Sequence, residues 1–439
     1  MAERHLMKGC GVFGSLYLRH RFVCFFLLFF VKFVLPPWNI SFPPSSKNMV
    51  IANPQMRVIL PEFRVSCLAG ILPNFAAGNR NQYIQSIYMK KIIIGIMAMT
   101  LTLTTNVHAQ GVQNKVAEKE ILQLVEDWDK TFPKSDKVEH EKVIFVNRFG
   151  ITLAADLYRA KDRNGALPAL AVSGPFGAVK EQSSGLYAQR LAEEGFVTLA
   201  FDPSFTGESG GHPRNLASPD INTEDFSAAV DYLITRGDVE ADKIGIIGIC
   251  GFGGFAVNAA AIDTRIKATI AVTMYDISRC TANGYYDEAD DAAKRQQMRR
   301  ALNAQRTEDI KNGTYKRSVM NPEPAADAPQ FMKDYYDYYK TPRGFHPRSI
   351  NSGQGWNLTS SLAFLNAPIL AYADEIERAV MLVHGEKAHS RYFSEDTFKR
   401  LKGSNKRLLI VPGAVHCDLY DNMSVIPFAE MVAFLRDNL

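Results

Sequence analysis

Three scarcities narrow the class of protein that this sequence encodes. It has no dense lysine or arginine run, and its formal net charge is only +4 over 439 residues. Nucleic acid is therefore a poor candidate for the partner. Cysteine is scarce, because only Cys250, Cys280 and Cys417 follow residue 110. Three thiols do not make a disulfide scaffold, and an odd number in an exported chain leaves at least one free or paired between chains.

The first hydrophobic stretch of the chain is too short to cross a membrane. Residues 22–35 are interrupted by Lys32 and fall short of the roughly 20 residues that span a bilayer. A second apolar segment follows Met89-Lys90-Lys91 and ends at Val107-His108-Ala109. A basic start, an apolar centre and an A-x-A-like end are typical of a secretory signal peptide, here residues 89–109. We therefore expect a periplasmic or secreted protein whose mature chain has no stable membrane association.

The signal peptide begins unusually late. We expect Met89 to be the true start, with residues 1–88 a non-native extension from an over-extended reading frame. The alternative is that residues 1–88 form a real membrane-proximal extension. Either way, residues 110–439 are expected to form the folded domain.

Strand-like and helix-like segments alternate along that domain. Short runs rich in Val, Ile, Leu and Ala are typical of strands buried on both faces; they lie at 168–173, 196–201, 244–249, 267–273, 379–384 and 407–411. Amphipathic stretches separate them at 184–195, 222–237, 252–262, 394–402 and 424–437. This alternation predicts an α/β fold with a mostly parallel central sheet flanked by helices.

Three further segments predict structure outside this alternating pattern. A hairpin is expected where Asn147–Gly150 separates two strand-like runs. Residues 110–140 have a helical pattern and predict an N-terminal helix. Residues 277–366 are polar, charged and rich in tyrosine, with a charged helix at 288–311, and predict an inserted lid over the active site. The alternative is a solvated decoration without a catalytic role.

The strongest chemical signal is the stretch from Lys243 to Gly254, KIGIIGICGFGG. An apolar strand meets Cys250, then glycines, then a helix, as in the turn that projects a nucleophile from a sheet. Small neighbours allow the strained backbone, and the helix dipole favours a thiolate. Phe252 departs from the common G-x-S-x-G form, so a buried structural cysteine is the alternative.

The order of residues along the chain supports a catalytic pair. His416 follows the last predicted strand, where the general base of an α/β-hydrolase is placed. The acid that would orient it is open between Glu386 and Asp276, with Glu386 slightly preferred, because Ala388 stands where many hydrolases have Asp. The oxyanion hole needs two amides: Gly251 supplies one, and Phe176 or Gly177 the other. The loop Phe201–Gly211 is expected to shape the pocket, with a plain turn as the alternative.

These motifs together resemble one group of enzymes. The sequence is similar to the dienelactone-hydrolase-like α/β-hydrolases, and especially to the bacterial subgroup near the X-Pro dipeptidyl-peptidase-like hydrolases. The motifs that carry this similarity are GxCxxGG, D-x-x-x-x-G-E-S-G-G, H-G-E and G-x-x-H-x-D-L-Y. The similarity covers about residues 140–439. The cysteine nucleophile is shared with dienelactone hydrolases, whereas the peptidase relatives use serine. The resemblance implies the α/β-hydrolase fold and a hydrolase, but scarcely a substrate.

Three functions follow as hypotheses. The first is a cysteine-dependent hydrolase of a small ester, lactone or thioester that forms an acyl-Cys250 intermediate. The second is a peptidase or amidase, and the third is a binding protein that retains the scaffold. A small molecule is the expected partner, with no metal and no cofactor; the oligomeric state stays open. Cys417 is expected to be a passive small residue, with a regulatory disulfide as the alternative.

Overall fold

The computed structural model describes residues 39–41, 49–53, 56–60 and 120–439. The predicted signal peptide at 89–109 lies outside the described residues, as does most of the predicted extension. The chain divides into two compact units, Met1–Val112 and Gln113–Leu439. The first contains a small antiparallel sheet of β1 (Asn39–Ser41), β2 (Met49–Asn53) and β3 (Met56–Leu60).

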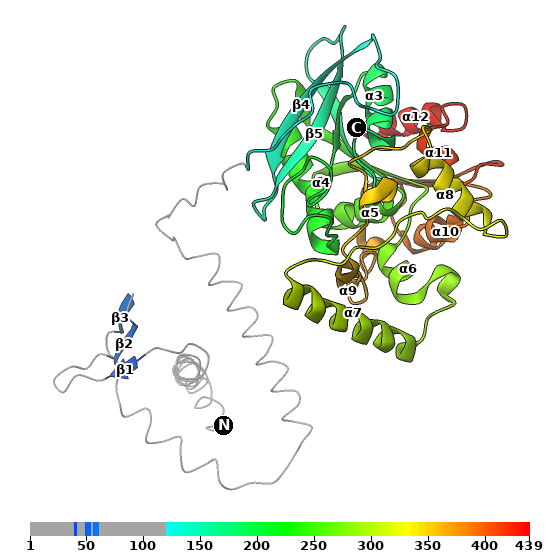
Figure 1. The fold of residues 1–439 in the computed structure, drawn as a ribbon. Coiled ribbons are helices and arrows are strands. Elements are labelled where there is room, and N and C mark those ends of the chain that lie inside the picture. The colour runs from blue at the N-terminus through cyan, green and yellow to red at the C-terminus, as the bar shows by residue number, and fades with distance from the viewer. Residues whose placement is uncertain (1–38, 42–48, 54–55, 61–119) are drawn as a thin grey trace, which may run out of the picture. The chain divides into compact units, whose positions relative to one another are not determined.

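The second unit is built on a sheet of eight strands (Figure 1). Their order is β11-β10-β9-β8-β6-β7-β5-β4, and only the pairings of β5 with β4 and with β7 are antiparallel. The strands are β4 (Val138–Val146), β5 (Thr152–Ala160), β6 (Leu167–Ser173), β7 (Val197–Phe201), β8 (Val239–Ile249), β9 (Ile266–Val272), β10 (Ala379–Gly385) and β11 (Lys406–Val411). The predicted mostly parallel sheet and the predicted hairpin around Asn147–Gly150 are both confirmed.

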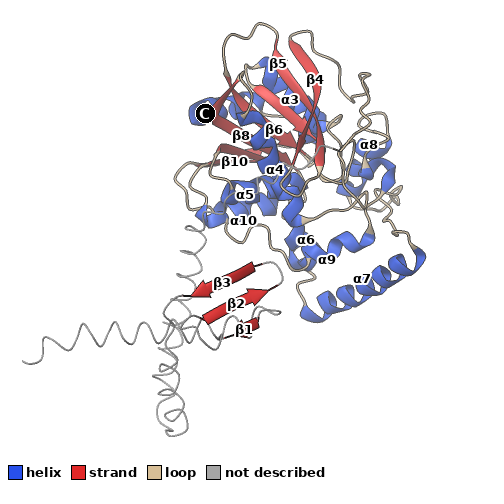
Figure 2. Cartoon of the chain, turned by 90° about the vertical axis from the view of Figure 1, so that its left-hand side faces the viewer, coloured by secondary structure: helices blue, strands red, loops and turns tan. Residues whose placement is uncertain are grey.

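Helices cover both faces of this sheet (Figure 2). One apolar core joins the sheet to α3 (Ser183–Glu193) and α12 (Phe428–Asn438). The other lies under α4 (Pro219–Ile234) and α5 (Gly251–Ile262), and Phe398 of α10 (Arg391–Arg400) packs against it. Strands β7, β9 and β10 are buried along almost their whole length, as apolar runs between two helical layers must be.

The predicted N-terminal helix is wrong for the described part of that segment. Residues 120–136 contain no helix, and Ile121 is 97% exposed. Several of their backbone amides bond to the body of the domain and not to carbonyls four residues earlier. The Glu120 amide donates to Thr152 Oγ1 (2.6 Å), and the Val125 amide to Glu208 Oε1 (2.7 Å). These long-range bonds replace the intrahelical ladder on which the periodic pattern would depend.

The long excursion between β9 and β10 has helices of its own. They are α6 (Ile277–Asn283), η3 (Tyr285–Asp287), α7 (Ala292–Asn312), α8 (Gln330–Lys340), η4 (Ile350–Gln354), η5 (Leu358–Ser360), α9 (Ser361–Phe364) and η6 (Ala373–Glu375). The predicted charged helix corresponds to α7, which lies away from the sheet in both views (Figures 1 and 2). Whether the excursion acts as a lid stays a prediction. Among the described residues, no helix is long and apolar enough to cross a membrane.

The strand order determines where a ligand can bind. From β6 the chain passes to β7 on one side and then returns to β8 on the other side of β6. The carboxyl ends of β6 and β8 therefore flank the point where the strand order reverses, the usual position of a ligand site in α/β sheets. Cys250 follows β8 there, and the loop carrying Phe176 follows β6.

Candidate active site

Cys250 lies at the turn between β8 and α5. Its backbone has φ 57° and ψ −126°, a conformation that costs a non-glycine residue free energy and that surrounding structure must enforce. Two backbone bonds do so: the Cys250 amide donates to the Val272 carbonyl (2.9 Å), and its carbonyl accepts from the Tyr275 amide (3.0 Å). The strained turn predicted from the sequence is thus present.

Close backbone approach explains the small residues around Cys250. A Cβ on Gly248 would lie 2.0 Å from the Phe252 carbonyl oxygen, and one on Gly254 would lie 2.3 Å from the Tyr275 carbonyl oxygen. Phe252 is tolerated because its ring is buried in the core beside Phe226 and Phe255. Its departure from the G-x-S-x-G form therefore leaves the turn intact.

Two backbone amides point at the Cys250 thiol. The Cys250 sulfur accepts hydrogen bonds from the amides of Gly251 and Phe176. The loops are in close contact here, because a Cβ on Gly251 would lie 2.6 Å from the Phe176 Cβ. Of the two alternatives for the second oxyanion amide, Phe176 faces the thiol, whereas the Gly177 carbonyl accepts from the Asn351 amide (3.0 Å). Two such donors can hold a developing oxyanion.

The resting charge of Cys250 differs from the sequence expectation of a favoured thiolate. Burial raises the pKa of Cys250, and the hydrogen bonds that Tyr420, Gly251 and Phe176 can give to the ionised sulfur offset that rise only in part. No cation is among the groups that shift this pKa. The dipole of one helix is too weak to stabilise a thiolate against full desolvation, so the thiol rests neutral.

His416 is the imidazole at this site, and it is 1% exposed. Its Nδ1 bonds to Ser390 Oγ (2.6 Å) and to Thr273 Oγ1 (2.8 Å), and its Nε2 bonds to the Tyr420 hydroxyl (3.0 Å). Burial, followed by the neighbouring His389 and His384, holds the pKa of His416 well below its usual value. The ring is therefore neutral at rest and able to accept a proton.

Neither predicted acid bonds to His416. Glu386 is exposed, and its carboxylate accepts from the Gly413 amide (2.8 Å). Asp276 caps helix α6 by accepting from the Arg279 amide (2.9 Å), and burial raises its pKa. The sequence predicts a carboxylate at His416 Nδ1, because a negative charge there would stabilise an imidazolium. In the structure, the neutral hydroxyls of Ser390 and Thr273 bond to Nδ1.

A chain of neutral groups continues behind His416. Ser390 Oγ also bonds to His384 Nε2 (2.9 Å), and His384 Nδ1 bonds to Ser394 Oγ (2.7 Å). Burial lowers the pKa of His384 to about 3. Sequence reasoning missed Ser390, Thr273, His384 and Tyr420 because it searched only for a carboxylate. One signal was available: Tyr420 follows His416 by four residues, a spacing that can return a side chain to the same face.

Tyrosines from the excursion lie beside the site. The Tyr275 hydroxyl bonds to those of Tyr285 (3.3 Å) and Tyr335 (3.0 Å), and also to His389 Nε2. The Tyr335 ring lies 5.4 Å from that of His416. The wall near the thiol therefore presents neutral hydroxyls and aromatic faces.

Two buried histidines and one half-buried histidine make acid stability a measurable property of this site. Burial lowers the pKa of His384 to about 3 and that of His389 to about 4, and the pKa of His416 is also lowered. Below about pH 6.5 these histidines are protonated in the unfolded chain but still neutral in the folded one. Their contribution to the free energy of unfolding therefore decreases as the pH falls toward the lowered pKa values.

We expect urea unfolding to show a loss between pH 6.5 and 4.5 that approaches about 1.4 kcal/mol per pH unit for each histidine. The variant His384→Gln should reduce the slope by about one proton. The comparison with wild type cancels the buried carboxyls such as Asp225, whose pKa burial raises to about 6 and which titrate with the opposite sign. A slope that is unchanged in His384→Gln would contradict the neutral, buried state of that ring.

All three thiols of the second unit are unpaired in the described structure. Cys250, Cys280 and Cys417 are free, and Cys417 is buried. Burial raises the pKa of Cys280 to about 12 and that of Cys417 well above its usual value. Neither is reactive in this state, in keeping with the passive role expected of Cys417.

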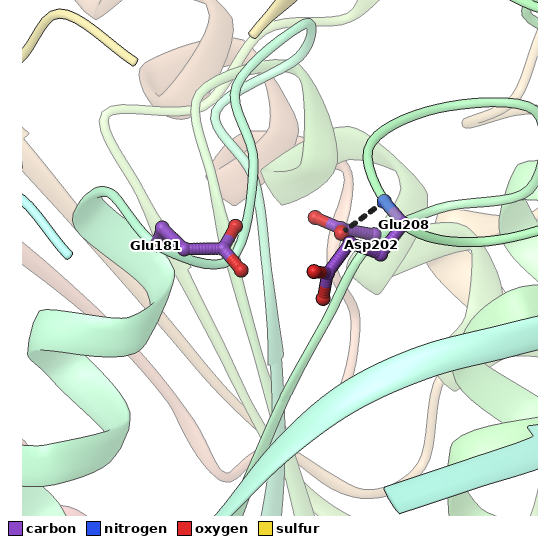
Figure 3. A group of neighbouring side chains, drawn as sticks. All are labelled: Glu181, Asp202 and Glu208. Atoms are coloured by element: carbon purple, nitrogen blue, oxygen red, sulfur yellow. Dashed lines mark hydrogen bonds between the residues drawn. The ribbon is translucent and has the colours of Figure 1, made fainter. Parts of the chain in front are cut away.

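A buried carboxylate cluster near the site already contains its cation. Glu181, Asp202 and Glu208 converge in Figure 3, and the Glu208 amide donates to Asp202 (2.8 Å). Lys180 Nζ bonds to all three carboxylates, at 2.6, 3.0 and 2.6 Å. Burial alone would lower the pKa of Lys180, but the carboxylates raise it well above its usual value. The ammonium takes the place a metal ion would need, so these residues do not fit a metal site.

This cluster fixes the loop that carries Phe176. The Lys180 amide donates to Asp202 (2.8 Å), and Arg348 of the excursion reaches Glu181 (2.8 Å). Asp202 and Glu208 belong to the loop Phe201–Gly211, which was expected to shape the pocket. Its buried carboxylates join the loop that carries Phe176 to its neighbours, and its role in shaping the pocket stays a prediction.

Comparison with known proteins agrees with this architecture. Residues 150–417 match the family model described as X-Pro dipeptidyl-peptidase (S15 family). The chain is 56% identical over 320 residues to the uncharacterized protein PA2218 of Pseudomonas aeruginosa, covering 72% of this chain and 86% of the relative. A crystal structure of that protein has a TM-score of 0.71, covering 73% of this chain and 100% of the other.

Two fungal proteins are similar at lower levels. The thiohydrolase aneE of Aspergillus aculeatus is 33% identical over 138 residues, which are 31% of this chain and 42% of the relative. The crystal structure of the α/β-hydrolase GrgF from Penicillium sp. has a TM-score of 0.54 at 21% identity, covering 68% of this chain and 99% of that one. At that identity the likeness shows the fold alone.

The eight-stranded sheet with helices on both faces, together with these structural neighbours, defines the fold as that of an α/β-hydrolase. The chain belongs to the X-Pro dipeptidyl-peptidase (S15) family, and so to the hydrolases of the α/β type. The part of the expected resemblance that pointed to X-Pro dipeptidyl-peptidase-like hydrolases is confirmed. The dienelactone-hydrolase-like subtype stays a prediction.

Proposed function

We propose that this protein hydrolyses a small ester, lactone or thioester through an acyl-Cys250 intermediate. The observation that carries the proposal is the Cys250 thiol held in a strained turn, with the amides of Gly251 and Phe176 bonded to its sulfur. A carbonyl oxygen bound by the same two amides would bring its carbon to the nucleophile. Export through residues 89–109 is a further part of the proposal.

The reaction has two balanced halves. The Cys250 sulfur loses its proton toward His416 and attacks the carbonyl carbon, and the carbonyl π electrons move onto the oxygen facing the two amides. As this oxyanion collapses, the carbon–leaving-group bond breaks and the His416 proton passes to the alcohol or thiol. Water then gives a proton to His416, attacks the acyl carbon and releases the acid, and the thiol is restored.

The absence of a carboxylate at His416 Nδ1 favours a proton transfer concerted with attack. In the Ser-His-Asp arrangement the buried carboxylate stabilises the imidazolium that forms. Here only the hydroxyls of Ser390 and Thr273 contact Nδ1, so an isolated thiolate–imidazolium pair would be poorly stabilised. A thiol is acidic enough to react without a full charge relay.

The family match favours a peptidase as the second candidate function. A peptidase that removes dipeptides must recognise a free amino terminus, and an ammonium requires an anionic partner. The thiohydrolase relative supports the acyl hydrolase, as does the neutral wall of tyrosines.

A substrate panel tests the choice. We expect p-nitrophenyl butyrate and S-phenyl thiobutyrate to be hydrolysed, and mass spectrometry of a quenched reaction to find a butyryl group on the Cys250 peptide. Faster turnover of Ala-Pro-p-nitroanilide would instead favour the peptidase. A panel with no turnover and no adduct would overturn the enzyme proposal in favour of a binding protein.

A further inference from the structure

We propose that Tyr420 is a further catalytic residue, whose hydroxyl carries the proton between the Cys250 thiol and His416. The proposal rests on the proposed function of Cys250 as nucleophile. Tyr420 belongs to the short helix α11 (Asp418–Asp421), is 0% exposed, and has its ring 5.3 Å from that of His416.

The Tyr420 hydroxyl bonds to both partners of the pair. It lies 3.0 Å from His416 Nε2, and its interaction with the Cys250 thiol lowers the pKa of that thiol. His416 itself is not among the groups that shift the pKa of Cys250. A phenolic hydroxyl has one proton to donate and lone pairs to accept with, so it can serve both neighbours at once.

The neighbouring bonds give this chain one direction. Neutral His416 that accepts at Nε2 must carry its proton on Nδ1, where Ser390 Oγ accepts it (2.6 Å). Ser390 then donates to His384 Nε2, whose Nδ1 donates to Ser394 Oγ. With Tyr420 donating to Nε2 and accepting from the thiol, every group in the chain is neutral and satisfied.

The relay step moves two protons and creates no phenolate. The Cys250 S–H proton passes to the Tyr420 oxygen while the Tyr420 proton passes to His416 Nε2, as the carbon–sulfur bond forms. Burial holds the pKa of Tyr420 well above its usual value, so the hydroxyl keeps one proton throughout. The reverse transfer returns the proton when the leaving group departs.

The test uses the full chain and the burst of p-nitrophenol released from p-nitrophenyl butyrate, which reports acylation of Cys250. Tyr420→Phe should lower the burst rate by about 10²- to 10⁴-fold, the usual share of positioned proton transfer, with little change in substrate binding. In mixtures of H₂O and D₂O, the wild type should show a curved rate dependence from two moving protons.

A matched variant separates catalysis from support of the helix. The Tyr187 hydroxyl donates to the Leu419 carbonyl (2.7 Å), so Tyr187→Phe loosens the same helix α11 without touching Cys250 or His416. It should keep the burst rate within a few-fold and the curved dependence. An unchanged or faster burst in Tyr420→Phe, or an equal loss in Tyr187→Phe, would overturn the relay. Neither result affects the proposed function, which is tested separately by the butyryl group on Cys250 and by the Cys250→Ala variant.

Discussion

Replacing Cys250 by alanine should abolish measurable ester and thioester hydrolysis, a loss of at least about 10⁴-fold in kcat. The physical reason is that the covalent path disappears with its nucleophile. The oxyanion amides of Gly251 and Phe176 remain, because they belong to the backbone and do not depend on the side chain. Steady-state hydrolysis of p-nitrophenyl butyrate measures this loss, and mass spectrometry should find no adduct.

The chain supplies two matched controls for this variant. Cys417 is a buried free thiol next to His416, and Cys280 is a half-buried free thiol on α6. Cys417→Ala and Cys280→Ala should retain activity within a few-fold, with and without reductant. If Cys250→Ala keeps wild-type turnover while remaining folded, the acyl-cysteine mechanism is refuted, and the strained turn has another use.

The second large effect is expected at His416. His416→Gln should lower the acylation rate by about 10²- to 10⁴-fold, because a neutral amide cannot take up the proton that leaves Cys250. Deacylation should slow as well, since water then lacks its base. Single-turnover measurements separate the two steps, and accumulation of butyryl-Cys250 would show that deacylation has become slower than acylation.

An exposed histidine provides the control. His212 lies on the surface of the loop after Gly211, and His212→Gln should leave both steps unchanged. A loss of less than about tenfold in His416→Gln would mean that another base serves Cys250. His389 is the nearest candidate, since its ring lies 5.4 Å from that of His416.

Much of the fold could be predicted because it depends on local patterns. Strands β6 to β11 coincide with the short apolar runs, and all but the edge strand β11 are largely buried between the helical layers. The hairpin around Gly150 and the turn at Cys250 follow from residues close in sequence. The N-terminal segment failed because its amides bond to Thr152 and Glu208, which lie far along the chain and outside any periodic pattern.

The candidate site divides in the same way. The turn at Cys250 can be predicted from neighbouring residues, and the amide of Gly251 follows from that turn. The position of His416 after β11 can be predicted from the order of the strands. Residues that orient the imidazole are a different matter. Ser390, Thr273 and Tyr420 come from three separate segments, and each is an ordinary side chain in its own stretch.

The sequence alone therefore determined the class of fold, the strained turn at Cys250 and the place of His416, because each depends on short-range backbone geometry or on the order of the strands. Only the tertiary structure decided the partners of the imidazole and the charge of the thiol. The first requires distant side chains to meet within hydrogen-bonding distance. The second depends on burial, which raises the pKa of Cys250 although the helix dipole acts in the opposite direction. The thiol is therefore neutral, as are the hydrogen-bonded imidazoles and hydroxyls that lie behind it.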